Sequence, residues 1–454
     1  MTNNNLLLAF YGDDFTGATD AMEALAMKGY RTVLFLKPPS LEMIASFDEI
    51  QCIGVAGTSR AKSPDGLEEE LHPIMEKLAQ SNARIVHYKT CSTFDSSPSV
   101  GSIGKAIQVS RSYFAEQSTI PLLVGAPALG RFTLFGNHFA RSGEEIYRLD
   151  RHPIMSKHPV TPMDESDLRK HLLKQLNEKV GLMNILELEG IYEEVEQRYS
   201  NKLIESDILL MDVLDQERLT TSGRLLWDSS KERSQFVVGS SGVEYALTSY
   251  WDKIGMPNSK ETIVKEKFNR CENILVMSGS ASEITKQQIE QAISQGFYGV
   301  RIPIELLVGD ENLSKDFLKD AVERLKKGQS VILYSALGPD DESIHETRKI
   351  LEGKGVSAID AGSYLGSQLG RWTKYLMKKA NIKCVVIAGG DTSGFATSEM
   401  NVYGLEVIQS ISPGAPLCRV YSDDGYMKDV QLALKGGQFG SPNYFSDVLN
   451  AVTV

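Results

Sequence analysis

The sequence predicts an α/β protein with two domains, each built on a mostly parallel β-sheet flanked by helices. Short apolar runs of strand length alternate along the chain with amphipathic segments, and this alternation is typical of parallel sheets covered by helices. The chain has 454 residues. Because single hydrophobic cores stop growing at about 250 to 300 residues, we expect two domains.

The expected strands fall into two series. The first series covers residues 6–10, 32–36, 52–56, 84–88, 120–126, 207–213 and 235–239. The second covers residues 273–279, 299–302, 331–336, 384–390 and 405–408, with helices expected at 282–295 and 317–327. A polar segment that carries Gly and Pro separates the series, so we expect an N-terminal domain at 1–255, a linker at 256–270 and a C-terminal domain at 271–454.

Composition excludes several classes of protein. No apolar run approaches the length of a membrane span, and the N-terminus lacks the features of a secretory signal, so we expect a cytoplasmic protein. The net charge of -11 argues against nucleic-acid binding. Five cysteines without CxxC pairing indicate reduced thiols, and no paired Cys/His spacing predicts a protein-held metal. No feature decides between a monomer and a homodimer.

Gly, Ser, Thr, Asp and Arg concentrate directly after the expected strands, where ligands bind in open parallel sheets. In the second half these loops read SGSAS, GGDTSG and LKGGQFGS. Each alone is well explained as a glycine turn with a helix N-cap. Three such loops in one domain favour a nucleotide, because backbone N–H groups at helix starts bind phosphate. Walker A and GxGxxG motifs are both absent.

In the first half, Asp13 and Asp14 follow the first strand. One of them is expected to cap the next helix, and the other is then free to act as a general base. Arg60 and Lys89 follow later strands and could bind a carboxylate, with Ser92 and Thr93 beside Lys89. His138 lies in a polar loop, where substrate contact and a structural hydrogen bond are both open.

These motifs together resemble the four-carbon acid sugar kinase family. YGDDFTGATD is similar to the opening signature of that family, and GTSR, KTCST, HPVTPMDESDL, SGSAS, GGDTSG and LKGGQFG follow in the same order over nearly the whole chain. The resemblance implies a kinase that uses ATP and Mg²⁺ to phosphorylate a terminal hydroxyl of a small sugar acid, such as a threonate, an erythronate or a 3-oxo-tetronate.

The resemblance also implies roles for individual residues, with the active site in a cleft between the domains. Asp13, Asp14, Arg60 and Lys89 fall on the substrate side, and we favour Asp14 over Asp13 for the chemistry. The nucleotide side comprises Ser280, Ser282, Gly389, Gly390, Asp391, Thr392, Gly436 and Gly437.

One segment departs from the pattern of the family. Where other members read Lys-x-Asp-Ser-Thr-Leu-Arg-Gly, this chain has Cys91 in place of the Asp and Phe94-Asp95 in place of Leu-Arg. The changed charge suggests a subgroup that acts on a related, branched acid such as 3-oxo-isoapionate. Two other classes stay open from the residues alone: a nicotinamide-dependent sugar-acid dehydrogenase, and a sugar-acid sensor without catalysis.

Overall fold

The protein is described by a computed structural model that covers residues 6–158, 160–258, 270–309, 311–357 and 360–453. The chain divides into two compact units, Met1–Glu261 and Thr262–Val454. The division falls inside the linker expected at 256–270, of which residues 259–269 lie outside the described residues. No helix in the described ranges is both long and apolar enough to cross a membrane.

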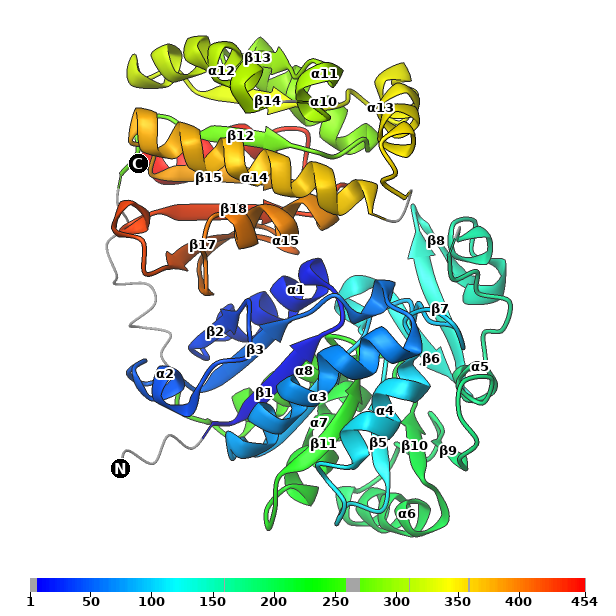
Figure 1. Cartoon of the computed structure of the whole chain (residues 1–454). Helices are drawn as coiled ribbons and strands as arrows, with labels where there is room; N and C mark the ends of the chain where they lie inside the picture. The colour runs from blue at the N-terminus through cyan, green and yellow to red at the C-terminus, as the bar shows by residue number, and fades with distance from the viewer. Residues whose placement is uncertain (1–5, 159, 259–269, 310, 358–359, 454) are drawn as a thin grey trace. The chain divides into compact units, whose positions relative to one another are not determined.

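The N-terminal unit is built on a parallel sheet with the strand order β2-β3-β1-β4-β11-β5-β10-β9 (Figure 1). Its strands are β1 Leu8–Gly12, β2 Thr32–Phe35, β3 Cys52–Ala56, β4 Ile85–Lys89, β5 Ile120–Leu123, β9 Val180–Met183, β10 Ile208–Met211 and β11 Gln235–Gly239. Its helices are α1 Phe15–Ala26, α2 Leu41–Ala45, α3 Pro64–Gln80, α4 Ile103–Arg111, α5 Leu168–Leu172, α6 Tyr192–Glu205, α7 Gln216–Ser229 and α8 Gly242–Lys253.

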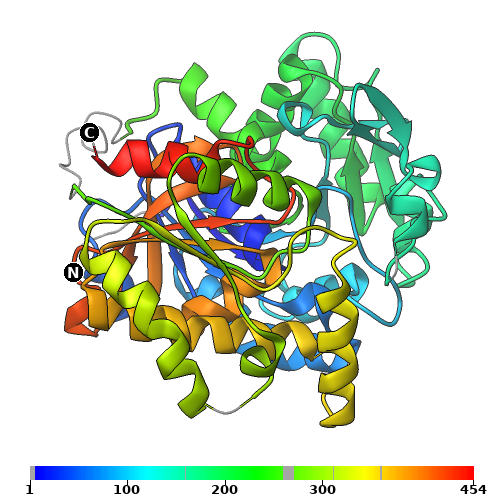
Figure 2. The same ribbon diagram turned by 90° about the horizontal axis from the view of Figure 1, so that it is seen from above.

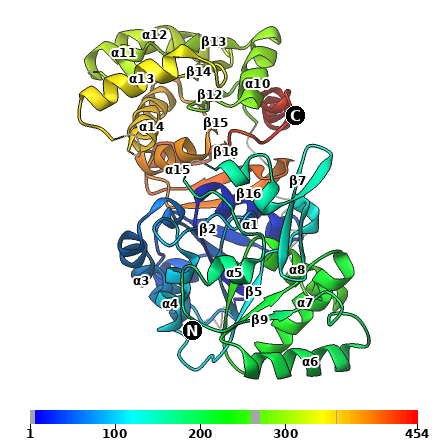
Figure 3. The same ribbon diagram turned by 90° about the vertical axis from the view of Figure 1, so that its right-hand side faces the viewer.

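Helices cover both faces of this sheet. The β1-α1-β2 and β3-α3-β4 crossovers run across the sheet in opposite directions, and because such connections are right-handed, α1 and α3 lie on opposite faces. Helix α4 packs on α3, whereas α8 packs on both α1 and α7. Figure 3 shows α3 and α4 on one side of the unit and α7 and α8 on the other.

A small antiparallel sheet lies at one side of the N-terminal unit (Figures 1 and 2). It consists of β6 Arg131–Leu134, β7 Asn137–Ser142 and β8 Glu145–Arg148. The sequence analysis missed these strands because they are short, partly exposed and rich in Arg, Asn and Glu, which leaves little apolar alternation to detect.

The C-terminal unit has the strand order β13-β14-β12-β15-β18-β17-β16, with only β17 antiparallel to its neighbours. The strands are β12 Leu275–Ser278, β13 Tyr298–Arg301, β14 Val331–Tyr334, β15 Cys384–Ala388, β16 Gly404–Ser412, β17 Ala415–Tyr421 and β18 Gln431–Lys435. The helices are α10 Glu283–Ser294, α11 Ile304–Leu307, α12 Glu311–Lys326, α13 Glu342–Gly353, α14 Ala361–Ala380, α15 Gly390–Glu399 and α16 Tyr444–Thr453.

Two helical layers enclose the sheet of this unit as well. Helix α14 packs against α12 and α15, and α10 packs against α16, which Figure 2 shows in red beside it. The apolar faces of α10 and α16 close a core with β12, β15 and β18 that includes Ile289, Val276, Val386 and Phe445. The predicted α/β class with mostly parallel sheets is therefore confirmed.

Candidate active site

The acidic pair and the two cations of the N-terminal unit meet at one edge of its sheet. Strand β1 lies between β3 and β4, and Gly12 is in register with both Ala56 and Lys89. The backbone N–H of Asp13 donates to the carbonyl of Lys89 at 3.0 Å, and that of Arg60 donates to the carbonyl of Asp13 at 3.0 Å. The three strand ends therefore place these residues side by side, as the sequence analysis expected.

Asp14 is the residue that caps helix α1. Its Oδ1 accepts the N–H of Gly17 at 3.1 Å, and its Oδ2 pairs with Nη2 of Arg60 at 3.1 Å. Both oxygens are thus engaged, one by the helix and one by a cation. Neither oxygen of Asp14 is therefore free to accept a proton from a substrate hydroxyl.

The carboxylate of Asp13 differs in this respect. Its side chain is 2% exposed, and Oδ1 is buried without a hydrogen-bond partner among the described residues. Burial, together with the neighbouring Asp14 carboxylate, raises the pKa of Asp13 to about 7, although Arg60 and Lys89 oppose the shift. A pKa near neutrality suits a general base.

Lys89 and Arg60 supply positive charge beside the acidic pair. Burial by itself lowers the pKa of Lys89, but Asp14, Asp13 and Asp20 outweigh it, so the pKa is raised and the ammonium stays charged. A methyl group on Gly17 would lie 2.0 Å from Nζ of Lys89, so only glycine lets helix α1 start this close to the cation. Arg60 keeps 35% of its side chain exposed, which leaves part of its guanidinium accessible.

The loop after β4 carries the residues that depart from the family pattern. Oγ1 of Thr93 donates to Asp95 at 2.7 Å and lies 3.1 Å from Sγ of Cys91. Between them, Phe94 is fully buried and adopts a φ of 57°. A bulky residue in the left-handed region is strained and persists only where its surroundings hold it. Within this held loop, the hydrogen bond to Asp95 fixes the position of the Thr93 hydroxyl.

His138 supports this loop from strand β7. It is fully buried, and its ring nitrogens lie 2.9 Å from Oγ1 of Thr133 and 2.9 Å from the carbonyl of Ser92. Burial lowers its pKa to about 4, so the ring is neutral near pH 7. The structure thus gives His138 a structural hydrogen bond to the backbone of Ser92.

Arg131, at the start of β6, is a residue that the sequence analysis did not single out. Its Nη1 donates to the carbonyls of Leu129 and Gly130 at 3.1 and 3.3 Å, and its buried Nε has no partner among the described residues. Burial lowers its pKa, while Cys91 and Asp95 act in the opposite direction. The guanidinium therefore lies within electrostatic reach of the loop after β4. The sequence analysis predicted no strand here and therefore gave no signal for this placement.

In the C-terminal unit, the three Gly-rich loops converge. A methyl group on Gly279 or on Gly389 would lie 2.3 or 2.7 Å from Oγ1 of Thr392, and one on Gly437 would lie 2.8 Å from Oγ of Ser280. The approaches of Gly279 to Thr392 and of Gly437 to Ser280 join loops that are 113 and 157 residues apart in the chain, whereas Gly389 and Thr392 belong to one loop. The absence of side chains at the three glycines is what lets the loops meet.

The hydroxyls of these loops form one network. Ser282 caps α10 through the N–H of Thr285 at 3.1 Å, and it also donates to the carbonyl of Gly437. Oγ of Ser280 accepts from the N–H of Ser282 at 3.3 Å and from Oγ1 of Thr285 at 3.0 Å. Lys435, which the sequence analysis noted only as the entry to its loop, donates to Oγ1 of Thr285 at 3.0 Å.

The other residues expected on the nucleotide side lie at the same edge. Gly389 has a φ of 132° and donates its N–H to the carbonyl of Lys435 at 2.9 Å. Gly390 and Thr392 belong to the first turn of α15, and Gly436 is buried directly after β18. The side chain of Asp391 lies outside the described part of the chain.

A cavity of about 210 Å³ adjoins the first of these loops. Gly279 and Ala281, directly after β12, form one wall. The rest of the lining is both apolar and polar, with Leu307, Ala336, Ile344, Leu351 and Leu365 beside Ser335, Ser343, Thr347 and Arg348. Ligand pockets are typically concave and mostly apolar, with a few polar groups that fix the orientation of the ligand. Sequence analysis missed this wall because leucine and isoleucine on α11, α13 and α14 look like ordinary core residues.

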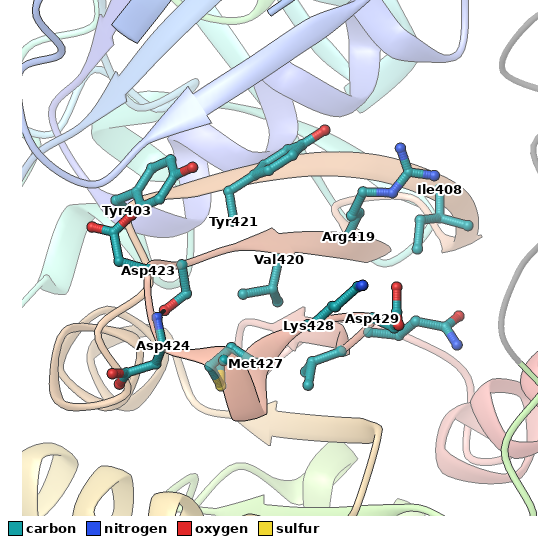
Figure 4. A pocket seen from close by; sticks show the side chains of 14 residues that line it. Tyr403, Ile408, Arg419, Val420, Tyr421, Asp423, Asp424, Met427, Lys428 and Asp429 are labelled. Atoms are coloured by element: carbon teal, nitrogen blue, oxygen red, sulfur yellow. Dashed lines mark hydrogen bonds between the residues drawn. The ribbon is translucent and has the colours of Figure 1, made fainter. Parts of the chain in front are cut away.

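A second hollow, of about 540 Å³, lies at the opposite end of β18 (Figure 4). Its lining includes Tyr403, Tyr421, Asp423, Lys428 and Gln431. Gln431 begins the strand whose other end, Lys435, carries the Gly-rich loop. This hollow therefore takes no part in the convergence of the three loops.

Among the described residues, no group of three or more His, Cys, Asp or Glu side chains could hold a metal ion. Mg²⁺ in phosphoryl-transfer sites keeps several waters and is bound through substrate phosphates with one or two carboxylates. The residues present fit an ion that enters with a nucleotide better than an ion held by the protein alone.

Two domain models of known protein families match most of this chain. Residues 8–247 match the sugar-binding N-terminal domain, and residues 275–445 match the nucleotide-binding C-terminal domain, of one family. The chain belongs to the four-carbon acid sugar kinase family. The resemblance read from the motifs is thereby confirmed, and with it a sugar-acid kinase with a nucleotide-binding domain; neither the dehydrogenase nor the sensor gains support.

Curated members of the family match over nearly their full length. The chain is 40% identical to the 3-oxo-isoapionate kinase of Paraburkholderia graminis, over 98% of this chain and 94% of that protein. It is 29% identical to the 3-oxo-tetronate kinase of Pseudomonas savastanoi pv. phaseolicola, over 99% and 98%.

A solved structure shares the fold. The Haemophilus influenzae protein HI1011 has a TM-score of 0.76 at 20% identity and covers 98% of this chain and 100% of its own. At this identity the likeness concerns the fold alone.

Proposed function

We propose that this sugar-acid kinase transfers the γ-phosphoryl group of ATP to a terminal hydroxyl of a small sugar acid, with 3-oxo-isoapionate as the first candidate. The observation that carries the proposal is the buried carboxylate of Asp13, whose Oδ1 has no partner in the described part of the chain, beside two cations in the sugar-binding domain. The 40% identity to a 3-oxo-isoapionate kinase supports the choice of candidate.

The cations bind the carboxylate of the substrate in this proposal. Arg60 presents a partly exposed guanidinium fork, which suits a carboxylate, and Lys89 adds a buried point charge. Arg131 lies near the loop in which Asp95 stands at the place of the usual family arginine, and we infer that it supplies the cation lost there. Ser92 and Thr93 contact substrate hydroxyls, and His138 positions Ser92 rather than touching the substrate.

Asp13, rather than Asp14, is the general base of the proposal. Both oxygens of Asp14 are engaged in capping and ion pairing, whereas Oδ1 of Asp13 receives no donor from any described residue. A substrate hydroxyl would be that donor: its proton passes to Asp13 as its oxygen bonds to phosphorus, and ADP leaves. Because phosphoryl transfer needs little covalent help, positioning and charge neutralisation should provide most of the rate.

The nucleotide lies on the C-terminal unit in this proposal. The loops at Gly279, Gly389 and Gly437 take the phosphates, and the cavity beside Ala281 takes the adenine ring. Mg²⁺ held by these phosphates would supply the positive charge that neutralises them. Transfer between the two sites requires the units to come together around both substrates, in a cleft that excludes water. A cytoplasmic location is part of the proposal, because a kinase must meet the ATP pool.

A coupled assay of ADP release over a panel of sugar acids tests the proposed function. We expect turnover with 3-oxo-isoapionate above that with 3-oxo-tetronate, threonate and erythronate, and a strict requirement for Mg²⁺. Loss of Mg²⁺ should abolish activity with every acid. If no acid raises ADP release above the rate with ATP alone, the function is not that of a sugar-acid kinase.

A further inference from the structure

Lys435 is a fully buried lysine at the end of the central strand β18. Its side chain is 1% exposed. Nζ donates to Oγ1 of Thr285 at 3.0 Å and approaches the carbonyl of Gly437 at 3.5 Å, and both acceptors are neutral. Buried charges are ordinarily paired with an opposite charge, because removing an ammonium from water is costly.

No described charged side chain compensates Lys435. The elements packed against β18 are β15, β17 and α15, and α10 contributes Thr285. Burial is the sole cause that lowers the pKa of Lys435, to about 7, with no contribution from a neighbouring charge. This contrasts with Lys89 of the other unit, which is just as buried but is held charged by three aspartates.

The ammonium lies where the three Gly-rich loops converge. Thr285, its hydrogen-bond partner, also contacts Ser280 and Gly437, and the carbonyl of Lys435 receives the N–H of Gly389. Oγ of Ser278, at the end of β12, is likewise fully buried and unpartnered among the described residues. An uncompensated cation and the free hydroxyl group of Ser278, beside glycine-rich loops, fit an anion that carries several acceptor oxygens.

We propose that Lys435 binds a phosphate group of the nucleotide, and that this phosphate provides the counter-charge that no described side chain supplies. The inference rests on the proposed function. It adds a phosphate-binding residue and a coupling between nucleotide binding and protonation of Lys435. Because free Lys435 is only partly protonated near pH 7, binding of the phosphate draws a proton onto its amine. Nucleotide affinity then falls as the pH rises through 7.

Calorimetric titration of the full chain with ADP and with adenosine tests the proposal. Lys435→Met should weaken ADP binding by about 10- to 100-fold, because a hydrogen bond to a charged group is lost, and leave adenosine binding unchanged. Lys383→Met is the matched control, since Lys383 also donates to two neutral oxygens, here the carbonyls of Lys428 and Tyr426 at 2.8 and 3.3 Å, but lies at the other end of the sheet. It should bind both ligands like the wild type.

The proton linkage gives an independent readout. In Lys435→Met, only titration of the ligand phosphate should change ADP affinity between pH 6 and pH 8. In the wild type, ADP affinity should fall over the same interval by about tenfold more than in this variant. Equal ADP affinity of Lys435→Met and wild type at both pH values would overturn the proposal while leaving nucleotide binding intact. Weakened adenosine binding in Lys435→Met would overturn it too, as a general structural defect. Absence of ADP binding to the wild type would instead reject the nucleotide site itself.

Discussion

The adjacent carboxylates Asp13 and Asp14 have different surroundings although they share one strand end. Asp14 is held by a helix N-terminus and a guanidinium, which both stabilise its charge. Asp13 is buried against that charge with an oxygen unpartnered among the described residues. Sequence predicted that one of the pair would cap α1 and favoured Asp14 for the chemistry, which left the cap to Asp13. The structure instead shows the cap at Asp14. The surroundings of the pair depend on Arg60, which comes from another strand, so sequence alone could not give the assignment.

The raised pKa of Asp13 predicts a stability cost. Its folded pKa of about 7 lies above the unfolded value of 3.8, so the wild type loses stability as the pH rises through this interval. Asp13→Asn removes the buried charge and should raise the Tm at pH 8 by about 2–4 °C or more, with a much smaller difference at pH 5. Differential scanning calorimetry at both pH values measures this. An Asp13→Asn protein less stable than wild type at pH 8 would show that the carboxylate is stabilised where it lies.

At the scale of elements, the nucleotide side contains the same arrangement three times: a buried strand, a glycine-containing loop and, for β12 and β15, a helix that starts within a few residues. The strands and the loops could be predicted from composition and order. Their convergence could not, since Gly279, Gly389 and Gly437 are brought together only by the order in which β12, β15 and β18 pair.

Gly389 provides a test of this convergence. Its φ of 132° and the 2.7 Å between an added methyl group and Oγ1 of Thr392 exclude any side chain. Gly389→Ala should weaken ADP binding by more than about tenfold, since repositioning Thr392 breaks the loop contacts. Gly355→Ala is the control, because Gly355 also has a positive φ, of 80°, but no atom within 4 Å. Equal loss of ADP affinity in both variants would mean that backbone strain, not the contact between loops, is responsible.

The small sheet β6–β8 and the contacts of its residues could not be predicted from a single sequence. Its strands are too polar and too short to give a recognisable strand pattern. They nevertheless place His138 against the carbonyl of Ser92 and Arg131 within electrostatic reach of Asp95. The exchange of the usual family arginine for Asp95 was visible in the sequence. The cation that we propose in its place was not, because it comes from a different element.

At the scale of the whole molecule, one unit is a sugar-binding domain and the other is a nucleotide-binding domain. The sugar-binding unit carries cations balanced by fixed carboxylates, whereas the nucleotide-binding unit carries one buried lysine without a described carboxylate partner. Each unit thus offers positive charge to an anionic substrate in a different way. The overall charge of -11 argues against polyanions as ligands but leaves these two local sites attractive to small anions.

The central claim is that Asp13 is the base that activates the hydroxyl of the sugar acid. The most direct measurement is the pH dependence of kcat/KM for ADP release with 3-oxo-isoapionate in wild type, Asp13→Asn and Asp14→Asn. We predict an acid limb with an apparent pKa of about 7 in the wild type, which persists in Asp14→Asn at reduced kcat/KM but moves to lower pH, because the Asp14 charge that raises the pKa of Asp13 is gone. In Asp13→Asn the limb should vanish and kcat should fall by about 10²- to 10⁴-fold. Wild-type kcat in Asp13→Asn, or loss of the limb in Asp14→Asn alone, would contradict the account.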